Sequence, residues 1–319
     1  MIKVGVSVLN HHAAELTVTC VQHLARAGRY VAATCELRAW VLDNGSGEQD
    51  QAVLAAALAE ESWVKLLFNE GNSGFAAGHN RNLRRILAAG PVDYVWLLNN
   101  DCLVDEECLA ALLDCSRRDP GVAIWGATLL EADHQTIQCA GGCYFSDWLT
   151  TYRQFGTGYN IQALDGIRPR PFDYIAGASM WLPINTLRQE LLPAPRHPQA
   201  PPVTAEAWLN ETFFLYFEEL DLAKRLKAGR RLGWCRDAVI VHGKRSREGD
   251  RERREIAEYH SDLSALKFTW LHQPGRLWFA LPARYLLKAA RHLLLLRWYL
   301  LPCMTRAYAA FFRWRTAGT

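Results

Sequence analysis

Long apolar runs are missing from this sequence of 319 residues, because no uninterrupted apolar segment reaches the roughly 18 residues that a conventional membrane-spanning helix needs. The nine cysteines form no Cys-x-x-Cys pair and are odd in number, which disfavours a zinc frame or a disulfide scaffold and predicts reduced thiols in a cytosolic protein. Neither a Gly-x-Gly-x-x-Gly fingerprint nor a Walker motif is present, so the usual dinucleotide-binding and NTP-hydrolysing classes do not apply. The chain opens directly on a strand-like segment, and we therefore expect no signal peptide.

Acidic residues are missing from the last part of the chain. After Asp262 there are nine Lys and Arg residues and no Asp or Glu, although the net charge of the whole chain is only +3. With 50% hydrophobic and 22% charged residues, the composition is typical of a folded globular protein. We therefore expect a mildly acidic body over residues 1–262, followed by a basic segment over residues 263–319.

Strand-like and helix-like segments alternate in the first half of the chain. Strands are predicted at residues 2–9, 37–42, 64–68 and 94–98. Helices are predicted at residues 14–27, around Leu54 and Leu58, after the glycine-containing loop 69–82, and from about Asp105 to Arg118. This alternation predicts the α/β class, with a mostly parallel sheet flanked by helices.

The strand at residues 94–98 ends abruptly in Asn99-Asn100-Asp101. Ligands of open α/β sheets collect at the carboxyl ends of the strands, so chemistry is expected at this turn. Asn99 and Asp101 alternate along an extended chain, and an oxygen-rich pair of this kind suits Mg²⁺ or Mn²⁺ with substrate phosphates. The alternative is an Asx turn that does no more than cap the strand and open the next helix.

The second half of the sequence is less regular. We expect a looser, aromatic-rich region at residues 121–175 that closes over the site, and a strand running into a helix at 172–181. An exposed proline-rich loop is predicted between Leu191 and Pro202. Residues 213–228 should place Glu218, Glu219 and Asp221 at the opening of a helix, followed by strands at 231–235 and 238–242 and a charged helix at 251–260.

Seven short motifs occur in an order that resembles the family 2 glycosyltransferases of the GT-A fold, with the pattern closest to rhamnosyltransferase-like members. They are Val8-Leu9-Asn10, Val41-Leu42-Asp43-Asn44-Gly45-Ser46, residues 72–80 (NSGFAAGHN), Leu97-Leu98-Asn99-Asn100-Asp101, Ile175-Ala176-Gly177-Ala178, residues 214–222 (FLYFEELDL), and residues 237–242 (DAVIVH). The resemblance extends from Val4 to about Trp270. It implies a GT-A domain over residues 1–262, with a donor half at about 1–120 and an acceptor half at about 121–262.

The resemblance also assigns residues to the donor and to a metal ion. The nucleotide-sugar donor would contact Asn10, Asp43, Asn72, Gly74, Gly78, Asn80, Asn99 and Asn100. Asp101 matches the constant acid of the family's Asp-x-Asp metal motif, while Asn99 replaces the other acid. With His242, Asp101 would hold Mg²⁺ or Mn²⁺, which would neutralise the diphosphate leaving group.

Catalysis by the family uses an acidic pair, which is Glu218-Glu219 in this chain. The resemblance makes Glu219 the candidate general base, with Glu218 beside it. We assign Gly177, Ala178, Trp181 and Asp221 to the acceptor side. The alternative is that these carboxylates cap a helix and pair with Lys224 and Arg225, and for Asp221 we favour the pair with Arg225.

The basic segment mixes arginines with aromatic residues and leucines, and Arg284, Lys288 and Arg291 share one helical face. This pattern favours a helix that lies on an anionic membrane surface, although a helix pair bracing the fold or a second subunit is the alternative. We therefore expect an inverting transferase that is peripheral on the cytoplasmic membrane and builds surface polysaccharide from dTDP-rhamnose or a UDP-sugar, with a saccharide or polyprenyl-linked acceptor. No nucleic-acid motif is present. A nucleotidyltransferase acting on a sugar phosphate and a degenerate, non-catalytic scaffold remain alternative functions.

Overall fold

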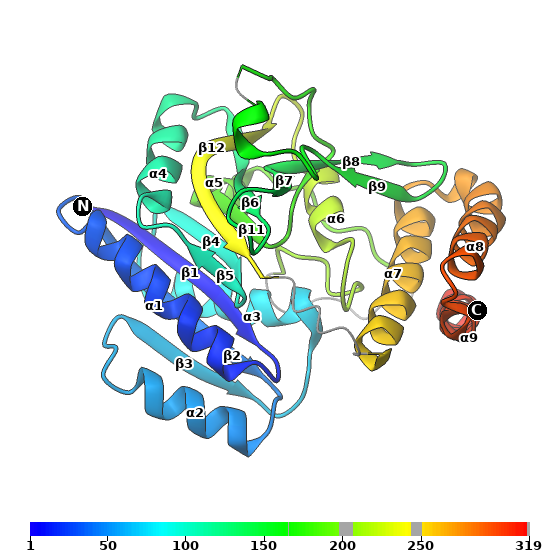
Figure 1. Ribbon diagram of the computed structural model, residues 1–319, viewed down its shortest axis with the longest axis horizontal. Helices are drawn as coiled ribbons and strands as arrows, with labels where there is room; N and C mark the ends of the chain where they lie inside the picture. The colour runs from blue at the N-terminus through cyan, green and yellow to red at the C-terminus, as the bar shows by residue number, and fades with distance from the viewer. Residues whose placement is uncertain (165, 198–206, 244–250, 318–319) are drawn as a thin grey trace.

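A nine-stranded mixed sheet forms the centre of this computed structural model, which describes residues 1–164, 166–197, 207–243 and 251–317 (Figure 1). Along the main path the strand order is β3-β2-β1-β4-β11-β6-β12-β5, and β7 pairs with β6. The first four neighbours are parallel and comprise β3 (Val64–Asn69), β2 (Cys35–Asn44), β1 (Ile2–Asn10) and β4 (Tyr94–Asn99). The expected α/β class and mostly parallel first half are confirmed.

Three helices connect these parallel strands and cover the sheet, namely α1 (Ala14–Tyr30), α2 (Glu48–Leu58) and α3 (Gly74–Ala88). The strands are apolar because both faces are covered, and Val4, Val6 and Val8 of β1 are all buried. Helix α3 begins at Gly74, so the loop predicted over residues 69–82 is too long by about two helical turns. The glycines of that stretch had been interpreted as loop residues, whereas Gly78 lets the helix pack closely on Leu9 of β1.

The region predicted to be loose contains the most buried strand of the sheet. All nine residues of β6 (Val122–Leu130) are buried. Strand β11 (Ser179–Pro183) runs antiparallel between β4 and β6, so the segment predicted as a strand entering a helix at 172–181 is instead two short strands separated by residues 176–178. The remaining strands of the large sheet are β5 (Cys102–Val104), β7 (Ile137–Ala140) and β12 (Arg231–His242). The two predicted strands at 231–242 are thus one strand, with a register shift between Cys235 and Val239.

A second sheet lies beside the first, in the order β10-β8-β9. It comprises β10 (Tyr174–Ile175), β8 (Gly142–Ser146) and β9 (Thr151–Gln154). The β8–β9 hairpin extends toward the C-terminal helices (Figure 1). The shorter helices are η1 (Ile161–Leu164), α4 (Cys108–Arg118), α5 (Ile184–Gln189) and α6 (Glu218–Lys224). Of the proline-rich loop predicted at 191–202, residues 198–202 lie outside the described part of the chain.

Three longer helices form the C-terminal end of the molecule. They are α7 (Arg251–His272), α8 (Leu277–Leu294) and α9 (Leu301–Thr316), with short turns η2 (Pro274–Arg276) and η3 (Trp298–Leu300) between them. The expected start of the basic segment, Leu263, falls inside α7 rather than between elements. Leu266 of α7, Leu277 and Leu281 of α8 and Phe311 of α9 form a small core of their own. Within the described residues, no helix has the length and apolar character needed to cross a membrane.

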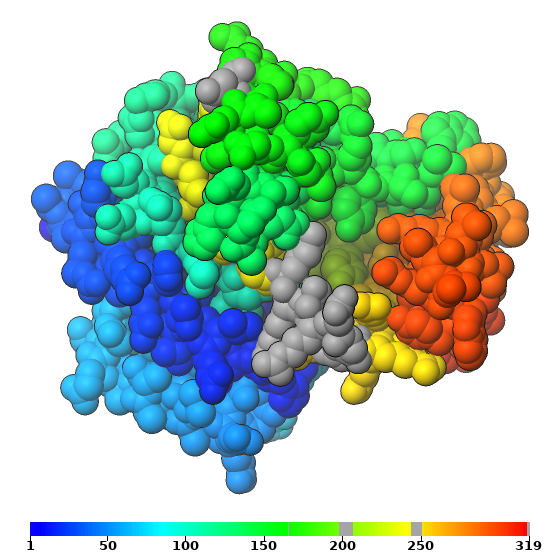
Figure 2. Space-filling model, in the orientation of Figure 1, coloured from blue at the N-terminus to red at the C-terminus, as the bar shows by residue number. Residues whose placement is uncertain are grey.

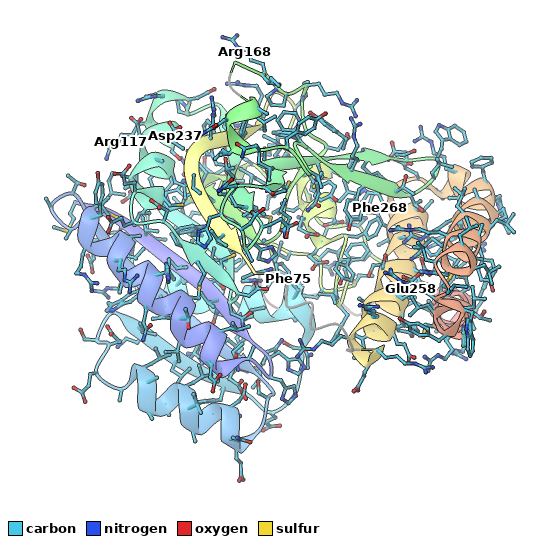
Figure 3. All side chains as sticks on the ribbon, in the orientation of Figure 1. Phe75, Arg117, Arg168, Asp237, Glu258 and Phe268 are labelled. Atoms are coloured by element: carbon cyan, nitrogen blue, oxygen red, sulfur yellow. The ribbon has the colours of Figure 1, made fainter. Side chains whose placement is uncertain are left out.

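The basic face of α8 points inward, against the orientation expected for direct contact with anionic lipid. Arg284 is 5% exposed, and its Nε donates to Asp262 Oδ1 of α7 at 2.7 Å. Lys288 Nζ contacts the same Asp262 oxygen at 2.7 Å and Glu258 Oε1 at 2.6 Å. Glu258 lies on the side of α7 that faces α8 (Figure 3). The basic inner face of α8 therefore packs against α7, as in the alternative in which the C-terminal helices brace the fold.

Candidate active site

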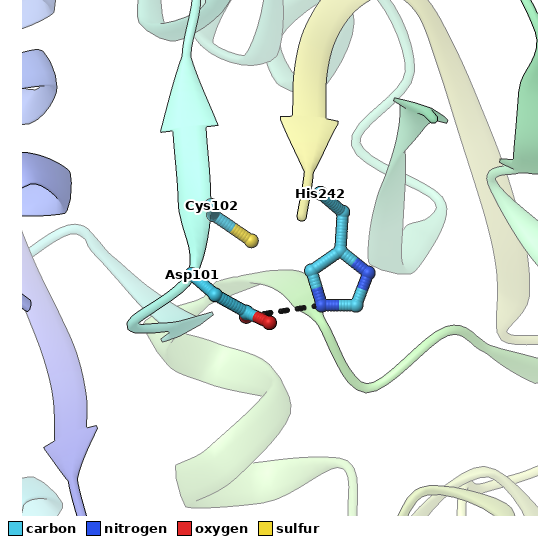
Figure 4. Close-up of side chains that lie close together, drawn as sticks. All are labelled: Asp101, Cys102 and His242. Atoms are coloured by element: carbon cyan, nitrogen blue, oxygen red, sulfur yellow. Dashed lines mark ion pairs between the residues drawn. The ribbon is translucent and has the colours of Figure 1, made fainter. Parts of the chain in front are cut away.

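The turn at Asn99–Asp101 connects two strands that are far apart in the sheet. It carries the chain from β4, in the middle of the order, to β5 at the edge, where β5 pairs antiparallel with the end of β12. In that pairing His242 lies opposite Cys102, so residues 140 positions apart in sequence become neighbours. Asp101 Oδ1 lies 3.1 Å from His242 Nε2 (Figure 4). The predicted pairing of Asp101 with His242 is therefore present.

Gln138 of β7 determines which nitrogen of His242 faces Asp101. The Nδ1–H of His242 donates to Gln138 Oε1 at 2.6 Å, which leaves a lone pair on Nε2. Asn99 Nδ2, a hydrogen-bond donor, lies 3.4 Å from that same Nε2 and can donate to its lone pair. Gln138 is 4% exposed and its Nε2 has no partner among the described residues. Sequence reasoning missed Gln138, because a lone Gln after an irregular stretch carries no motif.

The donor set at this turn fits a divalent cation. The ligand atoms of Asp101, Cys102 and His242 lie within 4.8 Å of one another. A carboxylate oxygen facing the lone pair of an imidazole nitrogen at 3.1 Å is favourable when a proton or a cation is shared between them. The Cys102 thiol donates to Ala178 O at 3.5 Å, and burial together with the charge of Asp101 raises its pKa well above the ordinary value. One carboxylate and one imidazole suit Mn²⁺ or Mg²⁺ that is completed by phosphate oxygens and water.

A chain of hydrogen bonds connects this turn to the end of β2. Asn100 Nδ2 donates to Thr17 Oγ1 at 2.8 Å, and Thr17 Oγ1 donates to Asn10 Oδ1 at 2.8 Å. Asn10 Nδ2 in turn donates to Asp43 Oδ1 at 2.8 Å. Three of the predicted donor-binding residues thus form one continuous network across the carboxyl ends of β1, β2 and β4. Thr17, the central member, was not predicted.

Asp43 is fixed by its own turn. Its carboxylate accepts from Ser46 N at 3.2 Å and Gln51 Nε2 at 3.0 Å, in addition to Ser46 Oγ and Asn10. Burial opposes ionisation, but these hydrogen bonds outweigh it and lower the pKa of Asp43. Asp43 is therefore an oriented anion whose oxygens are largely used within the chain, and its contact with a nucleotide stays a prediction.

The loop before α3 is held by Asn44. Its Oδ1 accepts from Asn69 Nδ2 at 2.8 Å and Ser73 Oγ at 2.8 Å, and its Nδ2 donates to Asn72 Oδ1 at 3.1 Å. Gly74 adopts φ +83°, and a Cβ there would lie 2.4 Å from Phe214 O. Asn72 is exposed, so its side chain lies at the surface where a donor-binding residue is expected.

Two of the residues predicted to bind the donor have structural roles instead. Asn80 is fully buried, and its side chain accepts from Trp208 N and Leu209 N while donating to Leu209 O and Glu211 Oε1. Gly78 is buried against Leu9. Both lie in α3 rather than in a loop, and this is why the family pattern alone misplaces them.

Two acceptor-side predictions also need correction. Trp181 is fully buried in the core, where it stacks on Tyr94 and its Nε1 donates to Ser116 Oγ at 2.8 Å. Asp221 is fully buried and contacts Arg225 Nε at 2.7 Å, as favoured from the sequence, together with His272 Nε2 at 2.8 Å. Neither side chain is available to an acceptor.

Gly177 and Ala178 lie between the turn and the acidic pair. Ala178 O accepts from Asn99 N at 3.0 Å, which joins this segment to the end of β4. On the other side, a Cβ placed on Gly177 would lie 2.2 Å from Glu219 Oε1. The carboxylate of Glu219 therefore occupies the space that a side chain at position 177 would need. These contacts connect both the Asn99–Asp101 turn and Glu219 to one short segment.

The two glutamates differ in accessibility. Glu218 is 1% exposed, and burial followed by the charge of Glu219 raises its pKa well above the ordinary value. Glu219 is half-buried, and burial raises its pKa to about 7. The residues before them, Tyr216 and Phe217, adopt left-handed backbone angles with φ of 68° and 75°, a strained conformation that is concentrated at functional sites. Glu219 is therefore the accessible carboxylate, with a pKa suited to accepting a proton near neutral pH.

Two further contacts connect the segment before Glu218 to both halves of the molecule. Phe75 N, at the start of α3, donates to Phe214 O at 2.8 Å, and Phe75 lies near the centre of the molecule (Figure 3). His260 of α7 stacks on Phe214 with ring centroids 4.6 Å apart. The acidic pair is therefore held by contacts from the donor loop and from the C-terminal helices.

The first part of the chain is similar to a known family. Residues 4–136 match the family described as glycosyl transferase family 2. The matched segment is less than half of the chain, and it contains β1 to β6 with the Asn99–Asp101 turn. No curated protein matches the sequence.

Solved structures resemble this chain over most of its length. S. aureus TarS in complex with UDP-GlcNAc is 12% identical with a TM-score of 0.52, covering 98% of this chain and 81% of that one. The mannosyltransferase PcManGT from Pyrobaculum calidifontis, in complex with GDP-Man and Mn²⁺, is 15% identical with a TM-score of 0.51, covering 97% and 86%. GalNAc-T7 with UDP, GalNAc and Mn²⁺ is 13% identical with a TM-score of 0.55, covering 89% and 55%. At these identities the likeness concerns the fold, and the expected GT-A fold is confirmed.

Proposed function

We propose that the protein is an inverting glycosyltransferase, assisted by a divalent metal ion, that moves a sugar from a nucleoside-diphosphate donor to an acceptor hydroxyl. The observation that carries this proposal is the position of Glu219, half-buried beside Gly177 with a pKa of about 7, next to the segment that contacts the Asn99–Asp101 turn. A carboxylate with this pKa is divided between its ionised and protonated forms at neutral pH. It can therefore remove a proton without a large energetic cost.

In the proposed reaction Glu219 accepts the proton of the acceptor hydroxyl. The acceptor oxygen forms a bond to the anomeric carbon as the bond from that carbon to the diphosphate oxygen breaks, and the nucleoside diphosphate leaves with the electron pair. A single displacement of this kind inverts the anomeric configuration. Asp101 and His242 would hold the divalent ion, which supplies positive charge to the diphosphate. Gln138 keeps the His242 ring in the tautomer that such binding requires.

The substrates proposed are dTDP-rhamnose or a UDP-sugar as donor, and a saccharide or polyprenyl-linked saccharide as acceptor, in surface polysaccharide synthesis. The support is the rhamnosyltransferase-like motif order together with the network from Asn10 and Asp43 to Asn100. For a lipid-linked acceptor we propose a peripheral position on the cytoplasmic face of the membrane.

The test is incubation of the purified full chain with a panel of nucleotide sugars and Mn²⁺, with products identified by mass spectrometry. We expect sugar transfer by the native protein, and a loss on the order of 10² to 10⁴ in the rate for Glu219→Gln, the usual contribution of a general base. Asp101→Ala should weaken Mn²⁺-dependent binding of the nucleoside diphosphate in calorimetry. In a parallel incubation with nucleoside triphosphates and sugar phosphates, release of pyrophosphate would instead indicate nucleotidyl transfer, and no binding of any nucleotide would indicate a non-catalytic scaffold.

A further inference from the structure

The outer face of α8 is apolar and uncovered. Nine of the 22 exposed large apolar side chains in the described residues lie within residues 278–298. Trp278 is 69% exposed, Leu286 67% and Leu294 84%, and they share a face with Phe279, Ala290 and Leu293 at helical spacing. This face is opposite the one that buries Arg284 and Lys288 against α7. Concentrations of exposed apolar surface of this kind mark interaction sites.

The tip of the β8–β9 hairpin belongs to the same surface. Trp148 is 54% exposed and contacts Phe279 of α8 edge-on, with ring centroids 5.6 Å apart. Arg276 lies over the Trp148 ring at 4.9 Å and pairs with Asp147 at 2.9 Å, while Arg284 Nη1 donates to Thr150 O. Figure 2 shows the hairpin meeting the C-terminal helices at one end of the molecule. The tip is therefore fixed to the helix and exposed together with it.

Charge identifies the partner. Residues 263–319 contain no acidic side chain, and two of their arginines lie against exposed tryptophans of this surface, Arg276 over Trp148 at 4.9 Å and Arg315 over Trp278 at 5.5 Å. A second copy that met this surface with its own α8 and α9 would bring further basic residues to it, so self-association of these helices places like charges together. Exposed leucines and tryptophans combined with basic residues fit the interface of an anionic bilayer, where apolar side chains enter the acyl boundary and arginines meet lipid phosphates.

We propose that the outer face of α8 and the tip of the β8–β9 hairpin form one surface that docks on an anionic lipid bilayer. This surface inserts leucines and tryptophans, whereas the buried basic residues Arg284 and Lys288 brace it from within. The hairpin would then connect the bilayer to the region around Glu219. Tyr152 of β9 packs edge-on against Tyr174. Burial raises the pKa of Tyr174, and the charge of Glu219 contributes to this shift. Docking itself is independent of the proposed transfer reaction.

Sedimentation with vesicles tests this surface without any donor or acceptor. The full chain should sediment with vesicles of phosphatidylcholine and phosphatidylglycerol, and much less with phosphatidylcholine alone. The double variant Leu286→Glu/Leu294→Glu should lower the partition coefficient by a factor on the order of 100, since two buried leucine side chains are lost and two acids are added. The control Ile167→Glu/Leu192→Glu adds the same charge at residues that are 46% and 50% exposed elsewhere, and should bind as the native chain does.

Two further measurements make the outcome decisive. Trp148→Glu should reduce binding by a smaller factor than the α8 double variant, and unchanged binding would remove the hairpin from the surface. Light scattering of the native chain and the α8 variant reports self-association. Equal vesicle binding by the native chain and the α8 variant would overturn the proposal, and loss of a dimer in that variant would identify a second copy as the occupant. Matching thermal unfolding curves confirm that the exposed substitutions leave the fold intact.

Discussion

At the scale of single residues, Glu219 connects structure to a measurable pH dependence. Because burial raises its pKa to about 7, kcat/KM should rise with pH through about 7 as the carboxylate ionises. The effect on folding has the opposite direction: ionisation is harder in the folded state, so the contribution of Glu219 to stability is present below its ordinary pKa of 4.5 and is lost as pH rises through about 7. A rate profile at saturating Mn²⁺ measures the first effect, and a flat profile between pH 6 and 8, within about one unit of that pKa, would contradict the assignment.

Gln138 gives a second prediction at this scale. Replacing it by Leu removes the acceptor for the Nδ1–H of His242, so the ring loses the tautomer and orientation that present Nε2 beside Asp101. We expect Mn²⁺ affinity to fall by about 10- to 100-fold, the usual effect of removing a partner behind a metal-binding histidine. Electron paramagnetic resonance of free Mn²⁺ measures this without turnover. The matched control is Gln135→Leu, at an exposed position just before β7. Equal Mn²⁺ affinities in the two variants would disprove the positioning role of Gln138.

At the scale of elements, the packing of α8 on α7 depends on buried charged side chains. Asp262 is fully buried and Arg284 is 5% exposed, so removing the guanidinium leaves a carboxylate in the interior with only Lys288 beside it. Arg284→Leu should lower the free energy of unfolding by about 3 kcal/mol. Replacing both partners by Leu should recover much of that loss, because no unpaired charge remains.

Denaturant titration followed by circular dichroism measures these differences. Arg313→Ala, at an exposed position of α9, should change the unfolding free energy little. If Arg284→Leu unfolds at the same denaturant concentration as the native chain, the ion pairs on the inner face of α8 contribute less to the free energy of unfolding than their burial indicates. The same contacts mean that removing residues 276–319 would uncover Asp262 and Leu266 of α7, so truncation perturbs the fold as well as the docking surface.

At the scale of the whole molecule, local patterns and long-range pairing differ in how well the sequence predicts them. The strands β1 to β4 and the helix opening at Glu218 follow from apolar runs and flanking turn residues. Strand β6 was not singled out, because Gly126 and Ala127 interrupt the strand-forming run of Val122, Ile124 and Trp125. The antiparallel insertion of β11 depends on tertiary pairing that periodicity does not encode.

The candidate site shows the same division. The motif order predicts site roles for Asp101, His242 and Glu219, and these roles stay predictions. The proximity of Asp101 to His242 depends on the pairing of β5 with β12, and that of Glu219 to Gly177 on tertiary packing, neither of which a motif encodes. Trp181 and Asn80 were misassigned because a motif records position along the chain and not the direction of a side chain. The orientation of α8 could not be derived either, since an amphipathic helix has two faces and the sequence does not say which one meets the acids of α7.

The pairing of β5 with β12 has a mechanical consequence. Since Cys102 and His242 lie opposite each other at the edge of the large sheet, Asp101 and His242 are carried by the same part of the molecule. Glu219 belongs to a different piece, which begins at the strained Tyr216–Phe217 backbone. In the proposed reaction, strand pairing alone would therefore place the two residues that hold the ion. The position of the base relative to them would depend on the separate segment that begins at Tyr216.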